Sequence, residues 1–426
     1  MSTAVTKLQT TAAALRERSR LSVTRVAAVS DQIVVSLTNF GLTIAIGRAF
    51  TAEEFASYGI GLSIGLMVQA LQRHTVTIPL MLRPTGRIAQ RHQAILAEQF
   101  LMLLGVLIAG AAAIGNVHLL GASRYGHLIT AASVVCLIVY IELEFSRAFL
   151  IKIGKPWFLL AGAAWYALVS LILAGAALTR RVDYETLLII LGGAMILHAL
   201  TLTAIAGRPA WRKGWTLLWV DIRRYGGWSA AATLTYTGYN HVPLLMLGAL
   251  AAPIHAAAFV ATRSLLQPLQ IILRGLDIAD KSMFAEAAKQ PYAREALSIT
   301  LTLAALYALV GFVFCAIAGL FADNLIALAY GPKFAGFGAA LLAWIPVYIL
   351  LSVAMPLESL VYARRDFLRY FQMRGAASLV AIAASLPLMN LYFETGAILA
   401  CALGWLLAVS GTFIRLVRNT DRSSGA

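Results

Sequence analysis

The stretch SDQIVVSLTNFGLTIAIGRAFTAEEFASYGIGLSIGLMVQALQRHTVTIPLML, residues Ser30–Leu82, decides how the rest of the sequence is interpreted. Four polar residues in its first half are spaced four, three and four positions apart: Gln32, Ser36, Asn39 and Thr43. This spacing places them on one face of a helix. The same spacing recurs later in the chain at Arg263, Gln267, Gln270 and Arg274. The residues around both stripes are apolar enough for lipid, where a polar face usually turns toward the bundle interior or a water-filled cavity. We interpret the stripes as the walls of a path through the membrane.

The composition excludes an ordinary soluble protein. The chain has 426 residues, of which 60% are hydrophobic and 12% charged, and a soluble fold of this size could not bury that much apolar surface. The formal charge of +15 does not indicate a nucleic-acid partner, because the basic residues lie in short loops between apolar runs. Each cysteine falls inside an apolar segment, which predicts small buried side chains rather than disulfides: Cys136, Cys315 and Cys401.

The apolar runs predict an all-α membrane protein with twelve transmembrane helices. A helix that spans the bilayer needs roughly 20 apolar residues. The predicted spans are 27–49, 55–82, 94–116, 126–151, 157–178, 184–206, 227–250, 254–280, 294–320, 336–363, 370–392 and 394–416. The resulting division is an N-terminal tail (1–26), a six-helix half (27–206), a linker (207–226), a second six-helix half (227–416) and a C-terminal tail (417–426). The N-terminal tail could be a basic interfacial helix or disordered.

The distribution of basic residues predicts the orientation. If the N-terminus is cytoplasmic, 26 of the 34 Lys and Arg residues lie in cytoplasmic segments or helix ends, and five lie on the outer side. This asymmetry follows the positive-inside rule and places both termini in the cytoplasm. It also favours an even number of spans, because one missed helix would disturb the alternation.

The two halves show a faint internal repeat. An offset of 201 residues aligns six identical pairs: Asn39 with Asn240, Gly47 with Gly248, Ala56 with Ala257, Ser63 with Ser264, Gln69 with Gln270 and Arg73 with Arg274. The polar residues of the two halves therefore occupy matching positions. Six spans per half would relate the halves by an axis along the membrane normal.

Two stretches carry a resemblance to a known family. The segment GRAFTAEEFASYGIGLSI (Gly47–Ile64) is similar to a helix end, a short acidic outer loop and an aromatic-Gly start of the next helix in bacterial Wzx-type polysaccharide flippases. These belong to the multidrug/oligosaccharidyl-lipid/polysaccharide exporter superfamily. The matching point in the second half is LGALAAPIHAAAFVATRSL (Leu247–Leu265). That family usually carries an acidic residue in the seventh span, whereas NHVPLLMLGAL (Asn240–Leu250) has none.

The resemblance implies two six-helix halves around a central cavity lined by spans one, two, seven and eight. It also implies the movement of a polyprenyl-pyrophosphate-linked oligosaccharide across the bacterial inner membrane, for exopolysaccharide or O-antigen synthesis. The expected partners are this substrate, membrane lipids, and a polysaccharide polymerase with its export machinery. The sequence contains no Walker motif, no paired Cys/His metal spacing and no Gly-x-Ser-x-Gly, so we expect no cofactor, no metal and no enzymatic activity.

The arginines within the predicted spans are candidates for binding an anion. Arg263 lies about 13 Å below the outer surface at about 1.5 Å per residue, too deep to reach the headgroups easily. A guanidinium there could bind the pyrophosphate of the substrate, or it could pair with a carboxylate on another helix. Arg73 and Arg274 lie near the cytoplasmic ends of their spans. They could form a basic mouth for the same group, or extend to the lipid headgroups without a transport role.

Neutral polar side chains in the same spans are candidates for binding sugar hydroxyls. Amides, a phenol and an imidazole suit this role, and interhelical hydrogen bonding is the alternative explanation. The candidates are Asn39, Asn240, Tyr239, His241, Gln69 and Gln270.

Carboxylates in the cytoplasmic third of the spans could couple transport to a proton or Na⁺. The candidates are Asp277, Glu142 and Glu358, with Glu144 close by, and plain ion pairs with nearby arginines are the alternative. Two other functions also fit the sequence. One is a small-molecule or drug:cation antiporter of the same superfamily, and the other is an envelope polysaccharide polymerase or ligase.

The predicted orientation can be tested with reporter fusions. Fusions after Arg181, Lys333 and Glu394 should report the outer side, and fusions after Lys155 and Lys213 should report the cytoplasm. Two adjacent fusion sites on the wrong side would contradict the twelve-span arrangement.

Overall fold

The computed structural model describes residues 2–82, 91–118, 124–225, 227–273, 276, 294–364 and 366–423, and the described part is helical with no strand. Its elements are α1 (Ser2–Ala49), α2 (Ala52–Gln72), the π-helix η1 (Arg73–Thr77), α3 (Ile78–Leu82), α5 (His92–His118), α6 (Arg124–Lys152), α7 (Pro156–Leu178), α8 (Tyr184–Ala206), α9 (Trp211–Tyr225), α10 (Gly227–Asn240), α11 (Val242–Leu250), α12 (Pro253–Leu265), α14 (Arg294–Leu320), α15 (Ala322–Tyr330), the 3₁₀ turn η2 (Pro332–Phe334), α16 (Gly338–Arg364) and α17 (Phe367–Ser423).

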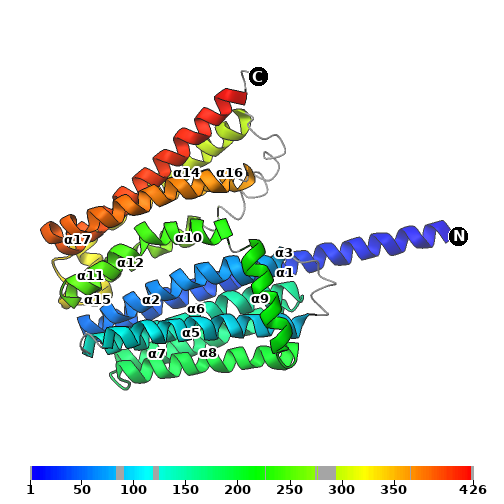
Figure 1. Ribbon diagram of the computed structural model, residues 1–426, viewed down its shortest axis with the longest axis horizontal. Coiled ribbons are helices and arrows are strands. Elements are labelled where there is room, and N and C mark those ends of the chain that lie inside the picture. Colours follow the sequence, from blue (N-terminus) through cyan, green and yellow to red (C-terminus); the bar gives the residue numbers. More distant parts are fainter. Residues whose placement is uncertain are drawn as a thin grey trace.

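The chain is a multi-pass membrane protein. Nine helical stretches among the described residues are long and apolar enough to cross a bilayer. One of them lies in α17 and covers two predicted spans, because Phe393 (φ 48°, ψ −122°) interrupts the helix and the chain turns back there (Figure 1). The predicted span 94–116 falls in α5, and the predicted span 227–250 is divided at His241 into α10 and α11. The count of twelve stays a prediction.

The acidic turn between the first two spans has a structural role. Thr51 is the N-cap of α2: its hydroxyl accepts a hydrogen bond from the Glu54 backbone N–H (3.2 Å), and the Glu54 carboxylate accepts one from the Thr51 N–H (2.9 Å). This reciprocal capping box satisfies two amides at the helix start that would otherwise lack a partner. The motif TAEE therefore fixes where the second helix begins.

Small residues bring α2 against α6. A Cβ atom added at Gly61 would lie 2.6 Å from the Ala132 carbonyl carbon, and one added at Gly65 would lie 3.0 Å from the Cys136 carbonyl oxygen. Glycines four residues apart let two helix backbones approach closely, which favours association in lipid where no hydrophobic driving force operates. The buried residues of α2, including Phe55 and Tyr58, continue this interface into the core.

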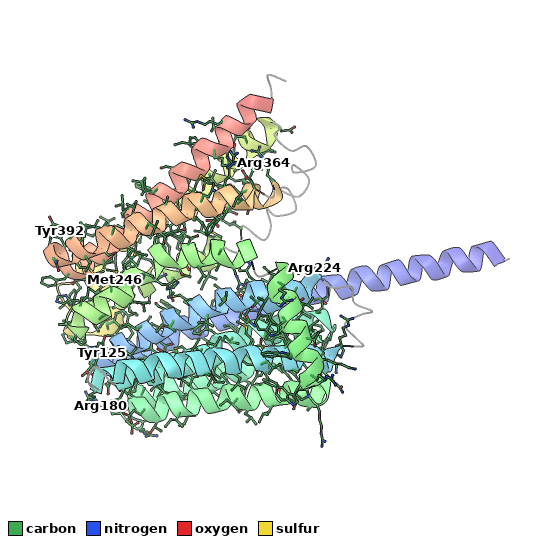
Figure 2. All side chains as sticks on the ribbon, in the orientation of Figure 1. Tyr125, Arg180, Arg224, Met246, Arg364 and Tyr392 are labelled. Atoms are coloured by element: carbon green, nitrogen blue, oxygen red, sulfur yellow. The ribbon has the colours of Figure 1, made fainter. Side chains whose placement is uncertain are left out.

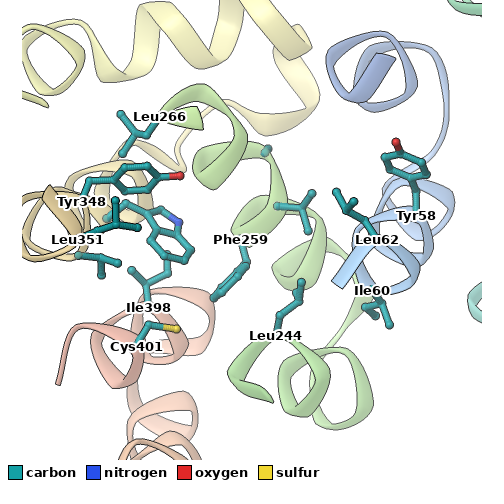
Figure 3. Packing of buried hydrophobic residues seen from close by; sticks show 14 of the residues in the cluster. Tyr58, Ile60, Leu62, Leu244, Phe259, Leu266, Tyr348, Leu351, Ile398 and Cys401 are labelled. Atoms are coloured by element: carbon teal, nitrogen blue, oxygen red, sulfur yellow. The ribbon is translucent and has the colours of Figure 1, made fainter. Parts of the chain in front are cut away.

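The helices form two groups that meet along α2 and α12. In Figure 1 helices α1, α2 and α5–α8 lie side by side, and α10–α17 form the other group, which diverges from the first toward the end of the molecule that carries both termini. At the opposite end the groups touch: a Cβ at Gly59 would overlap Val260, and one at Gly248 would overlap Ile60. Figure 3 shows Phe259 of α12 packed beside Leu244 and near residues of α16 and α17.

The basic side chains labelled at the ends of the helices fit the sequence-based orientation. Arg224 and Arg364 lie toward the end with the two termini, and Arg180 lies at the opposite end (Figure 2). α1 begins at Ser2, so the described part of the N-terminal tail is a helical extension of the first span. The three cysteines are buried and unpaired, as predicted.

Substitution of Gly61 tests the close packing of α2 on α6. Gly61→Val should lower the apparent melting temperature of the purified protein by about 1–3 °C, because overpacking against a backbone costs about 1–3 kcal/mol and a chain of this length has a large unfolding entropy. The matched control is Gly193→Val, where an added Cβ on α8 meets no atom within 4 Å. Equal melting temperatures for the two variants would contradict the packing account.

Candidate functional site

A cavity of about 270 Å³ lies between the two groups of helices. All four residues of the first stripe line it, together with the three described residues of the second: Gln32, Ser36, Asn39, Thr43, Arg263, Gln267 and Gln270. Gln69 and Arg73 of the second predicted span line the cavity as well, and so do Asn240 and His241 of the seventh. The pairs Asn39/Asn240 and Gln69/Gln270 of the internal repeat therefore line one space from the two halves.

Arg263 is the charged residue among the described residues of the C-terminal wall. Its Nη1 donates a hydrogen bond to the Asn240 carbonyl oxygen (3.1 Å), and its guanidinium lies over the Trp344 ring at 5.5 Å from the centroid. The Tyr348 hydroxyl donates to the Arg263 carbonyl (2.9 Å) and fixes the backbone. Among the described residues no carboxylate lies within ion-pair distance of this guanidinium. The alternative of a structural ion pair therefore has no partner in the described part of the chain.

The break between α10 and α11 supplies the carbonyl that holds Arg263. Pro243 has no N–H, and the Leu244 N–H bonds to the His241 carbonyl (3.1 Å) instead of continuing the helical pattern back to Asn240. The Asn240 carbonyl is thereby released from the helix and accepts the guanidinium N–H. The interruption in the seventh predicted span thus creates part of the site, as non-helical backbone at membrane depth does where it lines a cavity.

The N-terminal wall carries arginines that are already paired. Arg73 forms a two-pronged salt bridge with Glu144 (2.7 and 2.9 Å). The sequence analysis did not assign this partner to Arg73. Arg147 pairs with the buried Asp31 and lies 3.7 Å from Glu144. The cavity is lined by Arg73, Glu144 and Arg147. The pair between Asp31 and Arg147 was not predicted from the sequence.

Neutral polar groups complete the lining. Asn39 accepts a hydrogen bond from the Tyr166 hydroxyl, the Gln69 amide donates to the Tyr140 carbonyl (3.2 Å), and Asn240 donates to the Tyr236 hydroxyl (3.1 Å). Gln267 and Gln270 have no side-chain hydrogen bond within the described residues. Their amides can therefore bind a solute in the cavity without first breaking a protein contact.

Other predicted residues lie away from the cavity or outside the described ranges. Tyr239 is fully buried against the rings of Tyr236 and Trp405. Glu142 is buried inside the N-terminal half, 3.2 Å from His198 Nδ1, and Glu358 pairs with Arg374. Arg274 and Asp277 lie outside the described residues. No group of three or more potential metal ligands occurs in the described ranges.

Contacts between the halves close the cavity at the end opposite the termini. Arg48 donates to the Leu328 carbonyl (2.9 Å), and the Lys333 ammonium donates to the Phe50 carbonyl. Burial lowers the pKa of Lys333, and the nearby Glu54 opposes this shift. Behind these contacts, the rings of Phe55, Tyr330 and Phe334 pack together with centroid distances of 5.6–5.9 Å.

The comparisons with known proteins identify the fold. No family model and no curated protein matches the sequence. The lipid II flippase MurJ in an inward closed conformation matches with a TM-score of 0.69 at 11% identity, over 93% of this chain and 88% of that one. An inward-facing multidrug resistance MATE family transporter of the MOP superfamily also matches at 0.69, with 14% identity, over 94% and 99% of the chains.

A third match is a MOP superfamily transporter from Pyrococcus furiosus, described as having a binding pocket of reverse polarity. Its TM-score is 0.57 at 15% identity, over 94% of this chain and 95% of that one. At such identities the likeness shows the fold alone. The chain has the fold seen in these MOP superfamily transporters and flippases, in agreement with the fold that the sequence-based resemblance implied.

The closed end can be tested by thiol labelling of a cysteine placed in the cavity. A Gln270→Cys protein should react faster with a membrane-impermeant maleimide from the side of the termini than from the other side. Adding Lys333→Ala should raise the rate from the other side, because the bond to the Phe50 carbonyl is lost. Arg180→Ala, at the same end but outside these contacts, should leave both rates unchanged. A Lys333 variant that behaves like this control would contradict the account of closure.

Proposed function

We propose that the chain is a flippase that moves a polyprenyl-pyrophosphate-linked oligosaccharide across the bacterial inner membrane, with both termini in the cytoplasm. The observation that carries the proposal is Arg263, a charged side chain on the cavity wall whose described partners are a carbonyl and an aromatic ring rather than a carboxylate. The structural match to a protein described as a lipid II flippase supports the proposal.

The energetics favour an anionic ligand at Arg263. Placing an arginine at the centre of a bilayer costs at least about 2.5–3.5 kcal/mol on insertion scales. The Asn240 carbonyl and the Trp344 ring offset part of this cost but do not neutralise the charge. A pyrophosphate would do so, and a guanidinium binds phosphate oxygens in a two-pronged geometry.

The rest of the lining suits a sugar attached to that pyrophosphate. Gln267 and Gln270 follow the end of α12 and line the same cavity as Arg263, so their amides are available to hydroxyl groups of a ligand bound there. Asn39 and Gln69 present amides from the other half. A charged head beside a row of amides matches the order of groups in a pyrophosphate-linked saccharide.

A drug:cation antiporter is the second candidate, because a multidrug MATE transporter matches the fold equally well. The charges of the cavity argue against it. In the described lining, Arg73 and Arg147 are paired with Glu144 and Asp31, whereas Arg263 has no carboxylate partner and leaves a positive charge on the wall. A cationic solute would meet a positive wall, so the cavity favours anions. The third candidate, a polymerase or ligase, has no observation in the site that favours it.

Substitution of Arg263 separates these candidates. Arg263→Ala should insert and fold normally, since no described carboxylate loses its partner, yet it should lower transport of the lipid-linked substrate by at least about tenfold, because a hydrogen bond to a charged group contributes about 1.5–3 kcal/mol. Arg263→Lys should keep part of the activity, since it keeps the charge but loses the two-pronged geometry. The measurement is protein level in the membrane and polymer at the surface of the same cells.

Arg369→Ala is the matched control, because this exposed arginine belongs to the same half but lies outside the cavity. It should leave both protein level and polymer unchanged. Normal polymer from a normally expressed Arg263→Ala protein would exclude Arg263 as the pyrophosphate site. A large loss of protein would instead indicate a structural role.

Glu142 is the proposed coupling carboxylate among the described residues. It is buried beside His198, and no arginine or lysine pairs with it in the described part of the chain. Glu142→Gln keeps a side chain of the same shape but cannot release a proton. Transport into proteoliposomes should then lose its response to an imposed pH gradient, while Glu358→Gln, whose wild-type carboxylate already pairs with Arg374, should keep it. An unchanged response in the Glu142 variant would rule out this coupling role.

A further inference from the structure

We propose that α9 is an interfacial helix that binds anionic phospholipid headgroups in the leaflet at the end of the molecule that carries both termini. The observations are separate from the cavity and hold whichever substrate the protein moves. α9 runs across the ends of the neighbouring helices rather than along them (Figure 1), which is the orientation of a helix lying in the plane of the membrane surface.

One face of α9 is seated on the N-terminal half. Gly214 lies so close to α5 that an added Cβ would be 2.5 Å from the Ala97 Cβ and 2.9 Å from the Ala94 carbonyl. Leu218 and Asp221, four and seven residues later, are also buried. Just before the helix, the Ala210 N–H bonds to the Gln93 carbonyl (2.9 Å). α9 is thus a fixed part of the N-terminal half rather than a loose linker.

A second face presents a stripe of tryptophans. Trp211, Trp215 and Trp219 are 53%, 53% and 44% exposed and follow one another at four-residue intervals. This spacing places the three indoles along one side of the helix, next to the buried face. Indole rings favour the boundary between headgroups and acyl chains, because the ring is apolar and its N–H can reach a polar partner.

The third face is basic. Arg212, Lys213, Arg223 and Arg224 are exposed, and Asp221, the one acidic residue of α9, is buried. Going around the helix at about 100° per residue, the order is protein-facing side, tryptophan stripe, basic side. A helix in the membrane surface needs this order, with the indoles at the acyl boundary and the cations among the headgroups. An anionic headgroup complements the charge of the basic side, and a zwitterionic one does so less well.

The position of α9 gives this binding a mechanical consequence. The helix rests on α5 and leads within two residues into α10, a wall of the cavity. Lipid bound to α9 therefore holds the N-terminal half at the membrane surface, while α10 belongs to the half that must move when the cavity changes its access. α9 is an anchor for that motion.

Fluorescence quenching by brominated lipids tests the proposal on the full-length protein. Nanodiscs contain phosphatidylcholine and phosphatidylglycerol in a fixed ratio, with bromine on one lipid or the other. The signal from α9 is the difference between the wild type and a Trp211→Phe, Trp215→Phe, Trp219→Phe variant. We expect the α9 tryptophans to be quenched more strongly by brominated phosphatidylglycerol than by brominated phosphatidylcholine, and high salt to reduce this preference.

Two charge variants complete the experiment. Arg212→Gln, Lys213→Gln, Arg223→Gln should remove the preference, since one cation near an anionic surface changes a binding constant by about fivefold. Arg124→Gln, Arg180→Gln, Arg181→Gln, three exposed arginines at the opposite end, should keep it. Equal quenching by the two lipids in the wild type, or loss of the preference in the control, would overturn the proposal. No quenching by either lipid would place α9 outside the membrane and assign its face to a protein partner.

Discussion

The arrangement of the cavity depends on one electrostatic constraint, which is the cost of holding the Arg263 guanidinium within a membrane-spanning helix. The protein meets part of that cost with the Asn240 carbonyl and the Trp344 ring. The carbonyl is available because the seventh predicted span is interrupted near Pro243. The break in the helix therefore provides the hydrogen-bond acceptor for Arg263. We propose that the charge that remains gives the cavity a preference for an anion.

The two halves treat their arginines differently although the repeat relates their sequences. In the N-terminal half, Arg73 and Arg147 are matched by Glu144 and Asp31. These pairs join α1 and η1 to α6 beside the cavity and leave little net charge for a ligand. In the C-terminal half, the described part of the cavity wall offers Arg263 no carboxylate. We propose from this asymmetry that the N-terminal half supplies a rigid wall and the C-terminal half supplies the binding group.

Much of this site was predictable from spacing. Residues four, three and four positions apart must share a helix face, and the structure places Gln32 and Asn39 on the same cavity as Gln267 and Gln270. Spacing alone could not predict which of two adjacent residues faces the cavity where the helix is interrupted. Tyr239 lies beside Asn240 in the sequence, yet its ring packs into the core against Trp405 while Asn240 lines the cavity.

The pair between Asp31 and Arg147 joins residues 116 positions apart, and no local pattern signals such a contact. The multi-pass membrane class could be predicted because the length of an apolar helix depends on the membrane rather than on the details of packing. The interruptions were harder to place. Pro243 was visible in the sequence, but the carbonyl released at the break and the guanidinium that binds it become apparent only in the folded structure, where Arg263 of α12 reaches Asn240.

The central claim is that the Arg263 guanidinium binds the pyrophosphate of a lipid-linked saccharide. It is tested most directly by a cryo-electron microscopy structure of the full-length protein with a short-chain prenyl-pyrophosphate disaccharide. The account predicts phosphate density within hydrogen-bond distance of the Arg263 guanidinium, with the sugar extending toward Gln267 and Gln270. Phosphate density bound elsewhere in the cavity, with Arg263 still bonded only to Asn240 and Trp344, would contradict it.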